Sequence, residues 1–476
     1  LLKNTVIDEP YENMPAAEVG LKKGDVILAI GDSSMVGKDV AYVSNHLRGD
    51  AGTTFILTVQ RPSVNKKMKF KITRRSIQLP AVPYYGVQDG GVGYLNLNSF
   101  TTGCAKDVRR AFLDMKKQGM ISLVFDLRNN GGGSLQEAVN IVNMFVPKGI
   151  TLVKTVGKMD RANNEYKTTV EPIDTLMPIV VLVNDESASA SEITSGSLQD
   201  LDRAVVLGTR TYGKGLVQVS MDLPYNGNLK LTSSKYYIPS GRCIQAINYK
   251  HGNGGYTEHV PDSLTRVFHT ANGRVVRDGG GIKPDVEVRP DSLPNIAFYL
   301  ASSGRDSTEV MWNWELQYLK KHPTIGPAKT FVISDADFED FKQAVLKSGF
   351  KYDRESKKYL ENLVKLAKFE GYYDEAKPEF EALEKKLNHN LAKDLDYNKQ
   401  TLKKVLTSDL VSAYYYQKGS LENSLQFDKQ WKKAVEILQN PAEYKKLLQP
   451  VVGQPLVKLE PASNVAVDNK KKLKAK

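Results

Sequence analysis

The sequence predicts a multidomain α+β protein, and three observations support this fold class. The first 78 residues contain short strands around one short helix pattern. The middle of the chain alternates buried-type apolar strands with helix patterns, which is typical of an α/β core. From residue 296 the chain is rich in lysine, and apolar residues recur at helical spacing, most clearly over 336–448. A chain of 476 residues is long enough for two or three such domains.

The first unit, residues 1–78, is expected to be a small domain of strands and one short helix. A strand is expected at 26–30, a helix at 40–47 and a second strand at 55–59. Residues 14–25 carry the Pro-Ala-Ala, Gly-Leu and Gly-Asp pairs that mark the PDZ domains of bacterial proteases. The resemblance implies that this unit captures a peptide C-terminus as an added strand. The strand and loop that would bind the carboxylate are expected before residue 1, so we expect a PDZ domain that is N-terminally incomplete.

The second unit, residues 79–295, is expected to be the α/β core. Strands are predicted at 91–97, 121–125, 179–183 and 204–208, and helices at 105–117, 135–145 and 193–200. Three corners rich in small residues follow these strands, at 126–134, 184–192 and 208–218. Active-site loops lie at such positions in α/β folds, so chemistry is expected at these corners.

The corner at 184–192 contains three serines at alternating positions, Ser187, Ser189 and Ser191. A strand, a tight turn of small residues and a helix place a side chain at the end of the strand and point a helix N-terminus toward it. This arrangement suits a nucleophilic serine. The simpler interpretation is that Ser187 or Ser189 only caps the helix, and the stretch taken alone favours that interpretation.

The corner at 208–218 fits the phosphate-binding pattern GxxxxGK, ending at Lys214. Residue 215 is glycine where a P-loop needs serine or threonine, and the following residues predict a strand instead of a helix. We therefore reject a nucleoside triphosphatase. None of the six histidines lies in the three corners, which argues against a Ser-His-Asp triad. A neutral lysine can serve as base instead, although Lys214 taken alone fits a solvated turn lysine better.

Several motifs in register resemble the carboxyl-terminal processing (tail-specific) proteases, a Ser-Lys peptidase family. They are residues 126–133 (Asp-Leu-Arg-Asn-Asn-Gly-Gly-Gly), 184–193, 198–200, 211–218 (Thr-Tyr-Gly-Lys-Gly-Leu-Val-Gln), 236–245 and 281–285. The resemblance runs from the PDZ domain to about residue 290 and leaves out the helical part. It implies a Ser-Lys protease core of the crotonase-like ββα type.

The same resemblance assigns the site residues. It places the nucleophile at Ser189, the general base at Lys214 and a residue that orients the lysine at Gln218. The residues themselves suggest the two oxyanion donors: the N–H of Ala190, at the helix start, and that of Gly132, where glycine lets the backbone approach closely. A straight strand would separate positions 214 and 218 by roughly 13 Å. The chain is therefore expected to bend near Gly215, or the two side chains to reach toward each other.

Two further charged residues are expected to have structural roles. Asp200 lies about 16 Å along a helix from Ser189, too far to complete a triad, so we expect it to pair with an arginine. Arg128 is expected either to be such a partner or to anchor a substrate carboxylate, with the structural role favoured. The family often has proline where this chain has Gly131, and the glycine is expected to loosen this loop.

The function expected from these motifs is a serine endopeptidase that recognises proteins by accessible C-terminal tails and works through an acyl-enzyme, without cofactor or metal. A catalytically silent PDZ scaffold is the main alternative, and an acyl-CoA hydratase-like enzyme the second. A protease fused to a PDZ domain suggests the bacterial periplasm or another extracytoplasmic compartment, and homo-oligomers remain open. The helical part, residues 296–476, has no predicted role, and its tyrosine run at 414–416 is more often core than binding surface.

Composition narrows the partners further. The net charge of +12 comes largely from dispersed helix lysines and from the lysine-rich tail at 469–476, without the basic and aromatic stripe of a nucleic-acid-binding module. No apolar run approaches the 18 residues of a membrane span. The two cysteines, Cys104 and Cys243, show no metal-binding spacing and are expected to be separate thiols.

Overall fold

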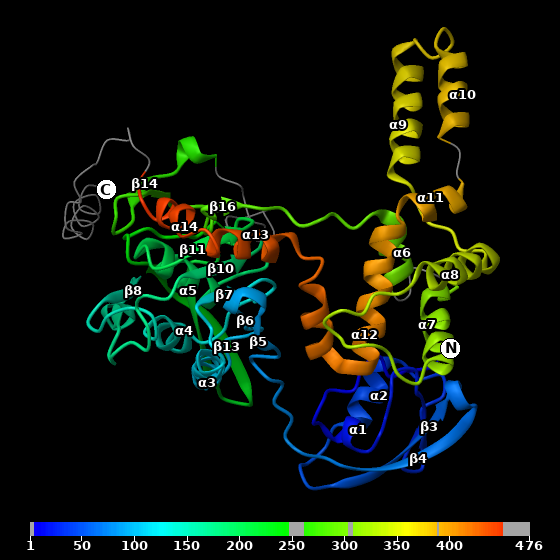
Figure 1. Cartoon of the computed structure of the whole chain (residues 1–476), viewed down its shortest axis with the longest axis horizontal. Coiled ribbons are helices and arrows are strands. Elements are labelled where there is room, and N and C mark those ends of the chain that lie inside the picture. Colours follow the sequence, from blue (N-terminus) through cyan, green and yellow to red (C-terminus); the bar gives the residue numbers. More distant parts are fainter. Residues whose placement is uncertain (1–3, 247–260, 303–307, 388–389, 451–476) are drawn as a thin grey trace. The chain divides into compact units, whose positions relative to one another are not determined.

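The computed structural model describes residues 4–246, 261–302, 308–387 and 390–450 (Figure 1). The chain forms two compact units, each built from two separate stretches. One unit contains residues 1–78 and 291–427, and the other contains residues 79–290 and 428–476. This division differs from the expected order of three consecutive domains, because the last stretch of the chain joins the middle one. The lysine-rich tail at 469–476 lies outside the described residues.

In the first unit, the N-terminal stretch forms a four-stranded antiparallel sheet in the order β2-β1-β3-β4. Its elements are α1 (Pro15–Glu18), β1 (Val26–Ile30), β2 (Ser33–Ser34), α2 (Val40–Leu47), β3 (Thr54–Arg61) and β4 (Lys66–Thr73). Alternate strand residues such as Ile27, Leu57 and Val59 turn inward onto Val43 of α2. The strand at 26–30 and the helix at 40–47 stand where the sequence predicts them.

The rest of the first unit is helical. Its helices are α6 (Asn295–Ala301), α7 (Val310–Lys321), α8 (Asp335–Ser348), α9 (Glu355–Glu370), α10 (Lys377–Lys386), α11 (Leu391–Tyr397) and α12 (Lys399–Ser424), with a break in α12 at Tyr416. Phe338, Phe341 and Val345 of α8 are buried in this core, whereas Leu346 is exposed. Tyr414 and Tyr415 donate to carbonyls of the segment after α7, so part of the tyrosine run serves the unit's own structure.

Within this unit, a buried ionic cluster joins the N-terminal stretch, residues 1–78, to α7 and α12. Lys23 lies 3.2 Å from the carboxylate of Glu315 and stacks over the ring of Trp312 at 4.9 Å. Burial raises the pKa of Glu315 to about 8, although Lys23 favours the charged form. Burial also raises the pKa of Asp409, which interacts with the same two side chains. In the folded unit, the carboxyl group of Glu315 therefore favours its protonated form at neutral pH.

This pKa predicts how the free energy of unfolding changes with pH. Below about pH 4.5 the Glu315 carboxyl is protonated in both states, whereas between about pH 4.5 and pH 8 only the unfolded chain releases the proton. The free energy of unfolding is expected to fall by about 2–4 kcal/mol as pH rises through this window, because release of the Glu315 proton stabilises only the unfolded chain.

Urea unfolding at pH 5 and pH 8.5, followed by the fluorescence of Trp312 and Trp314 in α7, measures this decline. Glu315→Gln is expected to remove most of it, because the amide does not titrate. Glu379→Gln, which changes an exposed carboxyl in α10, is the matched control and is expected to keep the wild-type decline. Equal pH profiles for Glu315→Gln and wild type would contradict the assignment.

The second unit contains a six-stranded sheet in the order β16-β11-β10-β7-β6-β5. Its strands are β5 (Tyr85–Gln88), β6 (Val92–Asn96), β7 (Ser122–Asp126), β10 (Ile179–Val183), β11 (Val205–Gly208) and β16 (Val286–Glu287). All neighbours are parallel except β5 and β6. The helices α3 (Cys104–Lys117), α4 (Leu135–Val142) and α5 (Ala190–Asp200) contribute to its main apolar core. The alternation of strands and helices in this core is therefore confirmed.

A second sheet, in the order β12-β13-β8-β9, completes the unit together with a small hairpin. These strands are β8 (Thr151–Gly157), β9 (Asn164–Lys167), β12 (Leu216–Leu223), β13 (Gly227–Tyr237), β14 (Val267–His269) and β15 (Val275–Arg277). Cys104 and Cys243 are both free thiols. Searching the described part of the chain for a helix long and apolar enough to cross a membrane finds none.

The six-stranded sheet is buried on both faces, which explains why the end of the chain joins this unit. Residues such as Phe125, Val181 and Val206 face the core with α3, α4 and α5. Their neighbours along the strands are just as buried and point to the opposite face. The helices α13 (Lys429–Leu438) and α14 (Pro441–Leu447) pack there, with α13 against β7, β10 and β11 (Figure 1). The division into compact units therefore falls near residue 427, inside the domain expected at 296–476.

Candidate active site

The three corners of small residues meet at one edge of the sheet. They follow β7, β10 and β11, which are parallel neighbours and therefore end on the same side. The N–H of Ala188 donates to the carbonyl of Asn130 at 3.0 Å. The N–H of Tyr212 donates to the carbonyl of Ser187 at 3.1 Å. The corner at 184–192 thus lies between the other two and is hydrogen-bonded to both.

Of the three serines in the central corner, Ser189 is the one available for chemistry. Ser187 and Ser191 are fully buried, and their hydroxyls donate to the carbonyls of Leu127 and Asn130 at 2.8 and 2.7 Å. Ser189 is half-buried and has φ 56° and ψ −110°, a backbone conformation that costs energy for a residue with a side chain. Such strain at the turn from a strand to a helix is typical of an exposed nucleophile.

Ala190 and Gly132, the expected oxyanion donors, lie beside Ser189. Ala190 is the first residue of α5, so its N–H has no acceptor within the helix. A Cβ atom on Gly132 would lie 2.6 Å from the carbonyl oxygen of Ala188 and 2.9 Å from the nitrogen of Ala190. The backbone of Gly132, with φ +98°, therefore approaches the corner as only glycine can. Its N–H donates to the side-chain oxygen of Asn130 at 2.9 Å.

A buried carboxylate, Glu192, joins the serine corner to the lysine corner. Its Oε2 accepts the N–H groups of Ser189 and Lys214 at 2.8 and 2.9 Å. Its Oε1 accepts the N–H of Gly213 and the hydroxyl of Thr211 at 2.7 and 2.6 Å. Burial raises the pKa of Glu192, although these four donors favour the ionised form. The amides of the P-loop-like turn are therefore occupied by a carboxylate of the protein, in agreement with the rejection of a phosphate site.

Tyr236 reinforces the same junction from β13. Its hydroxyl donates to the carbonyl of Lys214 at 2.7 Å and lies 3.3 Å from the carbonyl of Ser189. Burial raises the pKa of this phenol well above its ordinary value, so it remains a neutral donor. Glu192 and Tyr236 together hold the backbones of Ser189 and Lys214 side by side.

The backbone N–H groups of Ser189 and Lys214, the expected dyad, share one oxygen of Glu192, but their side chains are not bonded to each other. Lys214 is half-buried, and across the described ranges no hydrogen bond joins its ammonium group to the hydroxyl of Ser189. Gln218 is exposed on β12, opposite Thr232 of β13, and makes no hydrogen bond to Lys214 within the same ranges. The strand is irregular between Val217 and Gln218, close to where a bend is expected. The structure thus brings Ser189, Lys214, Gly132 and Ala190 together and leaves Gln218 apart.

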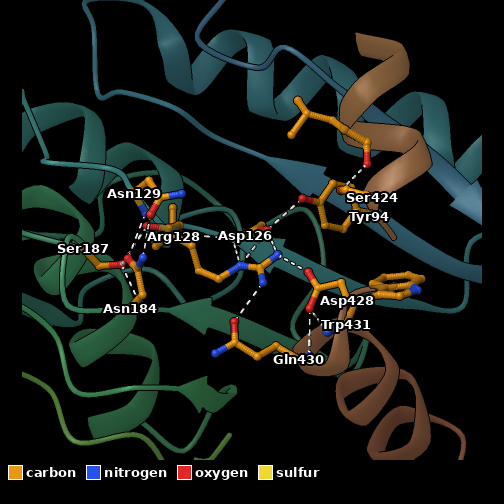
Figure 2. A network of polar contacts seen from close by, with 12 residues as sticks. Tyr94, Asp126, Arg128, Asn129, Asn184, Ser187, Ser424, Asp428, Gln430 and Trp431 are labelled. Atoms are coloured by element: carbon orange, nitrogen blue, oxygen red, sulfur yellow. Dashed lines mark hydrogen bonds and ion pairs between the residues drawn. The ribbon is translucent and has the colours of Figure 1, made fainter. Parts of the chain in front are cut away.

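Asp200 and Arg128 both have ion-pair partners. Asp200 accepts from the guanidinium of Arg242 at 2.8 Å, and both side chains are buried, so the expected pairing with an arginine is confirmed. Arg128 contacts Asp126 and Asp428, which supports the structural role over substrate binding (Figure 2).

Glu192, Tyr236 and Asn130 are the site residues that the sequence analysis left without a role. Glu192 stands three residues after Ser189, the spacing of a capping box, and this signal was available in the sequence. Asn130 and Tyr236 lie within motifs of the family resemblance, but nothing in their spacing shows that they face the serine corner.

Comparisons with known proteins match three consecutive stretches of the chain. Residues 91–252 match "Peptidase family S41", residues 6–61 match "PDZ domain", and residues 299–438 match "Probable PDZ-protease, C-terminal helical domain". The last match extends the likeness over the helical part, which the sequence motifs did not cover.

Two relatives with assigned names are similar over about half of the chain. A "Carboxy-terminal-processing protease" of Bartonella bacilliformis is 38% identical over 50% of this chain and 55% of its own. A "Probable CtpA-like serine protease" of Staphylococcus epidermidis is 34% identical over 52% of this chain and 48% of its own. The match therefore spans about half the length of these relatives. Among solved structures, the "photosystem II D1 C-terminal processing protease" matches 61% of this chain and 70% of its own, with 28% identity and a TM-score of 0.34.

Proposed function

The chain carries the domains of a PDZ-containing peptidase of family S41, and on that premise we propose that it is a serine endopeptidase with a Ser189–Lys214 dyad. The observation that carries the proposal is the serine corner. Ser189 alone of its three serines is partly exposed, at a strained turn whose backbone Glu192 ties to that of Lys214. A nucleophile, a base and two amide donors then converge at the end of one sheet.

The proposed reaction is acyl-enzyme hydrolysis of a peptide bond. Lys214 in its neutral form accepts the proton of Ser189, whose oxygen bonds to the peptide carbonyl carbon. The resulting lysinium gives this proton to the leaving amine as the C–N bond breaks, and water then cleaves the ester with Lys214 again as base. The dyad hydrogen bond must form when substrate binds, a tightening that is common at catalytic sites. Gln218 would orient the lysine if β12 shifts toward it.

The oxyanion of the tetrahedral intermediate would accept from Ala190 and Gly132. The N–H of Ala190 has no acceptor within its helix. The N–H of Gly132 would exchange its bond to Asn130 for the developing negative charge. We further propose that the PDZ domain selects proteins by their C-terminal tails and that the enzyme works in an extracytoplasmic compartment, as tail-specific processing implies.

A labelling experiment tests the proposed function. Wild-type chain is incubated with an unfolded protein that ends in an apolar tail, and separately with a serine-acylating reagent. We expect fragments in the first sample and, in the second, a mass increase that fragmentation of the labelled peptide assigns to Ser189 itself. An adduct on Ser187 or Ser191, or neither fragments nor adduct, would overturn the assignment. The last outcome would favour the silent scaffold.

Gly132→Ala tests the oxyanion donor. The new methyl group would overlap the backbone of Ala188 and Ala190, so the loop must move away from Ser189. We expect kcat to fall by about 10²–10³, the usual effect of losing one oxyanion donor. Gly131→Ala is the matched control, because no atom lies within 4 Å of the Cβ position there. Equal activity of the two variants would show that Gly132 is not a donor.

A further inference from the structure

Arg128 belongs to the loop 127–133, which also contains Gly132. Its guanidinium group contacts Asp428 and Gln430 at the start of α13 (Figure 2). Its Nε donates to both oxygens of Asp126 at 2.9 and 3.1 Å. Its Nη1 donates to the Oε1 of Gln430 at 2.8 Å, and its Nη2 lies 2.7 Å from an oxygen of Asp428. Gln430 is 302 residues further along the chain. The start of α13 therefore contacts the loop that carries Gly132.

Both residues at the start of α13 are themselves anchored. The Oδ1 of Asp428 accepts the N–H groups of Gln430 and Trp431 at 2.8 and 3.1 Å, which caps the helix and leaves Oδ2 for Arg128. Gln430 donates its Nε2 to the carbonyl of Val288 at 2.6 Å. The ring of Trp431 meets the ring of Tyr94 edge-on at 5.5 Å. The guanidinium is thus fixed to a helix and a sheet that lie outside its own loop.

The same loop is attached to the serine corner on its other side. The carbonyl of Asn130 accepts from the N–H of Ala188 and the hydroxyl of Ser191. Asn129 and Asn184 exchange two hydrogen bonds, at 2.9 and 2.6 Å. The loop 127–133, which includes Gly132, is therefore bonded to the serine corner on one side and to α13 on the other.

The charges in this network are largely removed from water. The exposed fraction of the side chain is 18% for Arg128, 3% for Asp126 and 13% for Asp428. Charge-assisted hydrogen bonds are about twice as strong as neutral ones. The ion pair with Asp428 therefore helps to fix the position of the Arg128 side chain and of its backbone. A displacement of about 1 Å in catalytic geometry can cost on the order of 10²-fold in rate.

We propose that Asp428 and Gln430 are positioning residues of the candidate active site, because by holding Arg128 they fix the loop 127–133 and keep Gly132 beside Ser189. The kinetic part of this proposal rests on the proposed peptidase function, whereas the structural part does not. The helix α13 then contributes to catalysis as well as covering the sheet.

Asp428→Asn separates the two roles of the aspartate. Asparagine caps a helix as well as aspartate does, so α13 keeps its N-terminus while Arg128 loses a charged partner. We expect kcat to fall by about 10-fold with KM within about two-fold of wild type, because the substrate still binds but the oxyanion loop is displaced. Hydrogen exchange measured by mass spectrometry is expected to speed up in the peptides covering 127–134 and to stay unchanged in β12 and β13.

Glu436→Gln is the matched control, because it removes one carboxylate from the exposed side of the same helix. Both variants are compared with wild type in the full chain. The proposal is overturned if Asp428→Asn exchanges and turns over like Glu436→Gln, or if its exchange rises evenly along the unit. If wild type itself cleaves nothing and forms no adduct, the peptidase function fails. Hydrogen exchange in the loop then still decides whether Asp428 positions it.

Discussion

Ser189→Ala and Lys214→Ala are each expected to lower kcat by a factor of about 10⁴–10⁶. The first change removes the atom that bonds to the substrate, and the second removes the acceptor of its proton. Because the two groups act as a unit, the double variant is expected to lose no more than either single variant. Release of fragments from an unfolded, apolar-tailed protein, followed over time, measures these rates.

Ser187→Ala is the internal control for this pair. Its hydroxyl is buried and donates to the carbonyl of Leu127, so its loss is expected to cost about 1 kcal/mol of stability and to leave the chemistry in place. Circular dichroism of each variant establishes that it is folded. Wild-type cleavage by folded Ser189→Ala would refute the nucleophile, and cleavage by folded Lys214→Ala would refute the base.

Glu192→Ala is expected to destabilise the core by at least about 3 kcal/mol and to abolish acylation of Ser189. The change leaves four donors without their acceptor: the N–H groups of Ser189, Gly213 and Lys214, and the hydroxyl of Thr211. It also releases the two backbones that carry the dyad. Thermal unfolding and the rate of adduct formation at a temperature where the variant remains folded measure the two effects separately.

Glu192→Gln makes this prediction sharper, because it keeps the shape of the side chain. Its amide group would face two of the four donors, so we expect nearly the same loss as for alanine. Glu186→Gln, on the exposed part of the same corner, is expected to behave like wild type. If Glu192→Gln acylated Ser189 at the wild-type rate, Glu192 would have no part in joining the two corners.

The catalytic candidates could be located from the sequence because they follow regular elements. The strand at 179–183 and the helix that follows it are apolar or small enough to predict directly, and they define the turn that carries Ser189. The role of Lys214 came only from the family resemblance, since its own sequence also fits a turn lysine. The backbones of the two residues are held together by the buried carboxylate of Glu192 and the hydroxyl of Tyr236, and Glu192 lies 22 residues before Lys214 in the sequence. Local patterns do not encode such a contact.

The partners of Arg128 and the boundary of the helical part could not be predicted for a related reason. Strands such as 179–183 are apolar on both faces, which indicates that two layers of helices cover the sheet. The sequence next to them supplies one layer, in α3, α4 and α5. The helical periodicity of 429–438 predicts an amphipathic helix, but it does not identify the sheet on which that helix packs. Its assignment depends on the pairing of Asp428 and Trp431 with residues some three hundred positions earlier.

The two-stretch construction of the second unit also affects how the protein is made. A ribosome that has finished β16 must still synthesise the whole helical stretch before α13 and α14 emerge. At synthesis rates of about 5–20 residues per second, this interval lasts on the order of 10–30 s. During it, one apolar face of the nascent sheet is uncovered and Arg128 lacks Asp428. A growing chain therefore carries its serine corner well before it can complete the loop beside it.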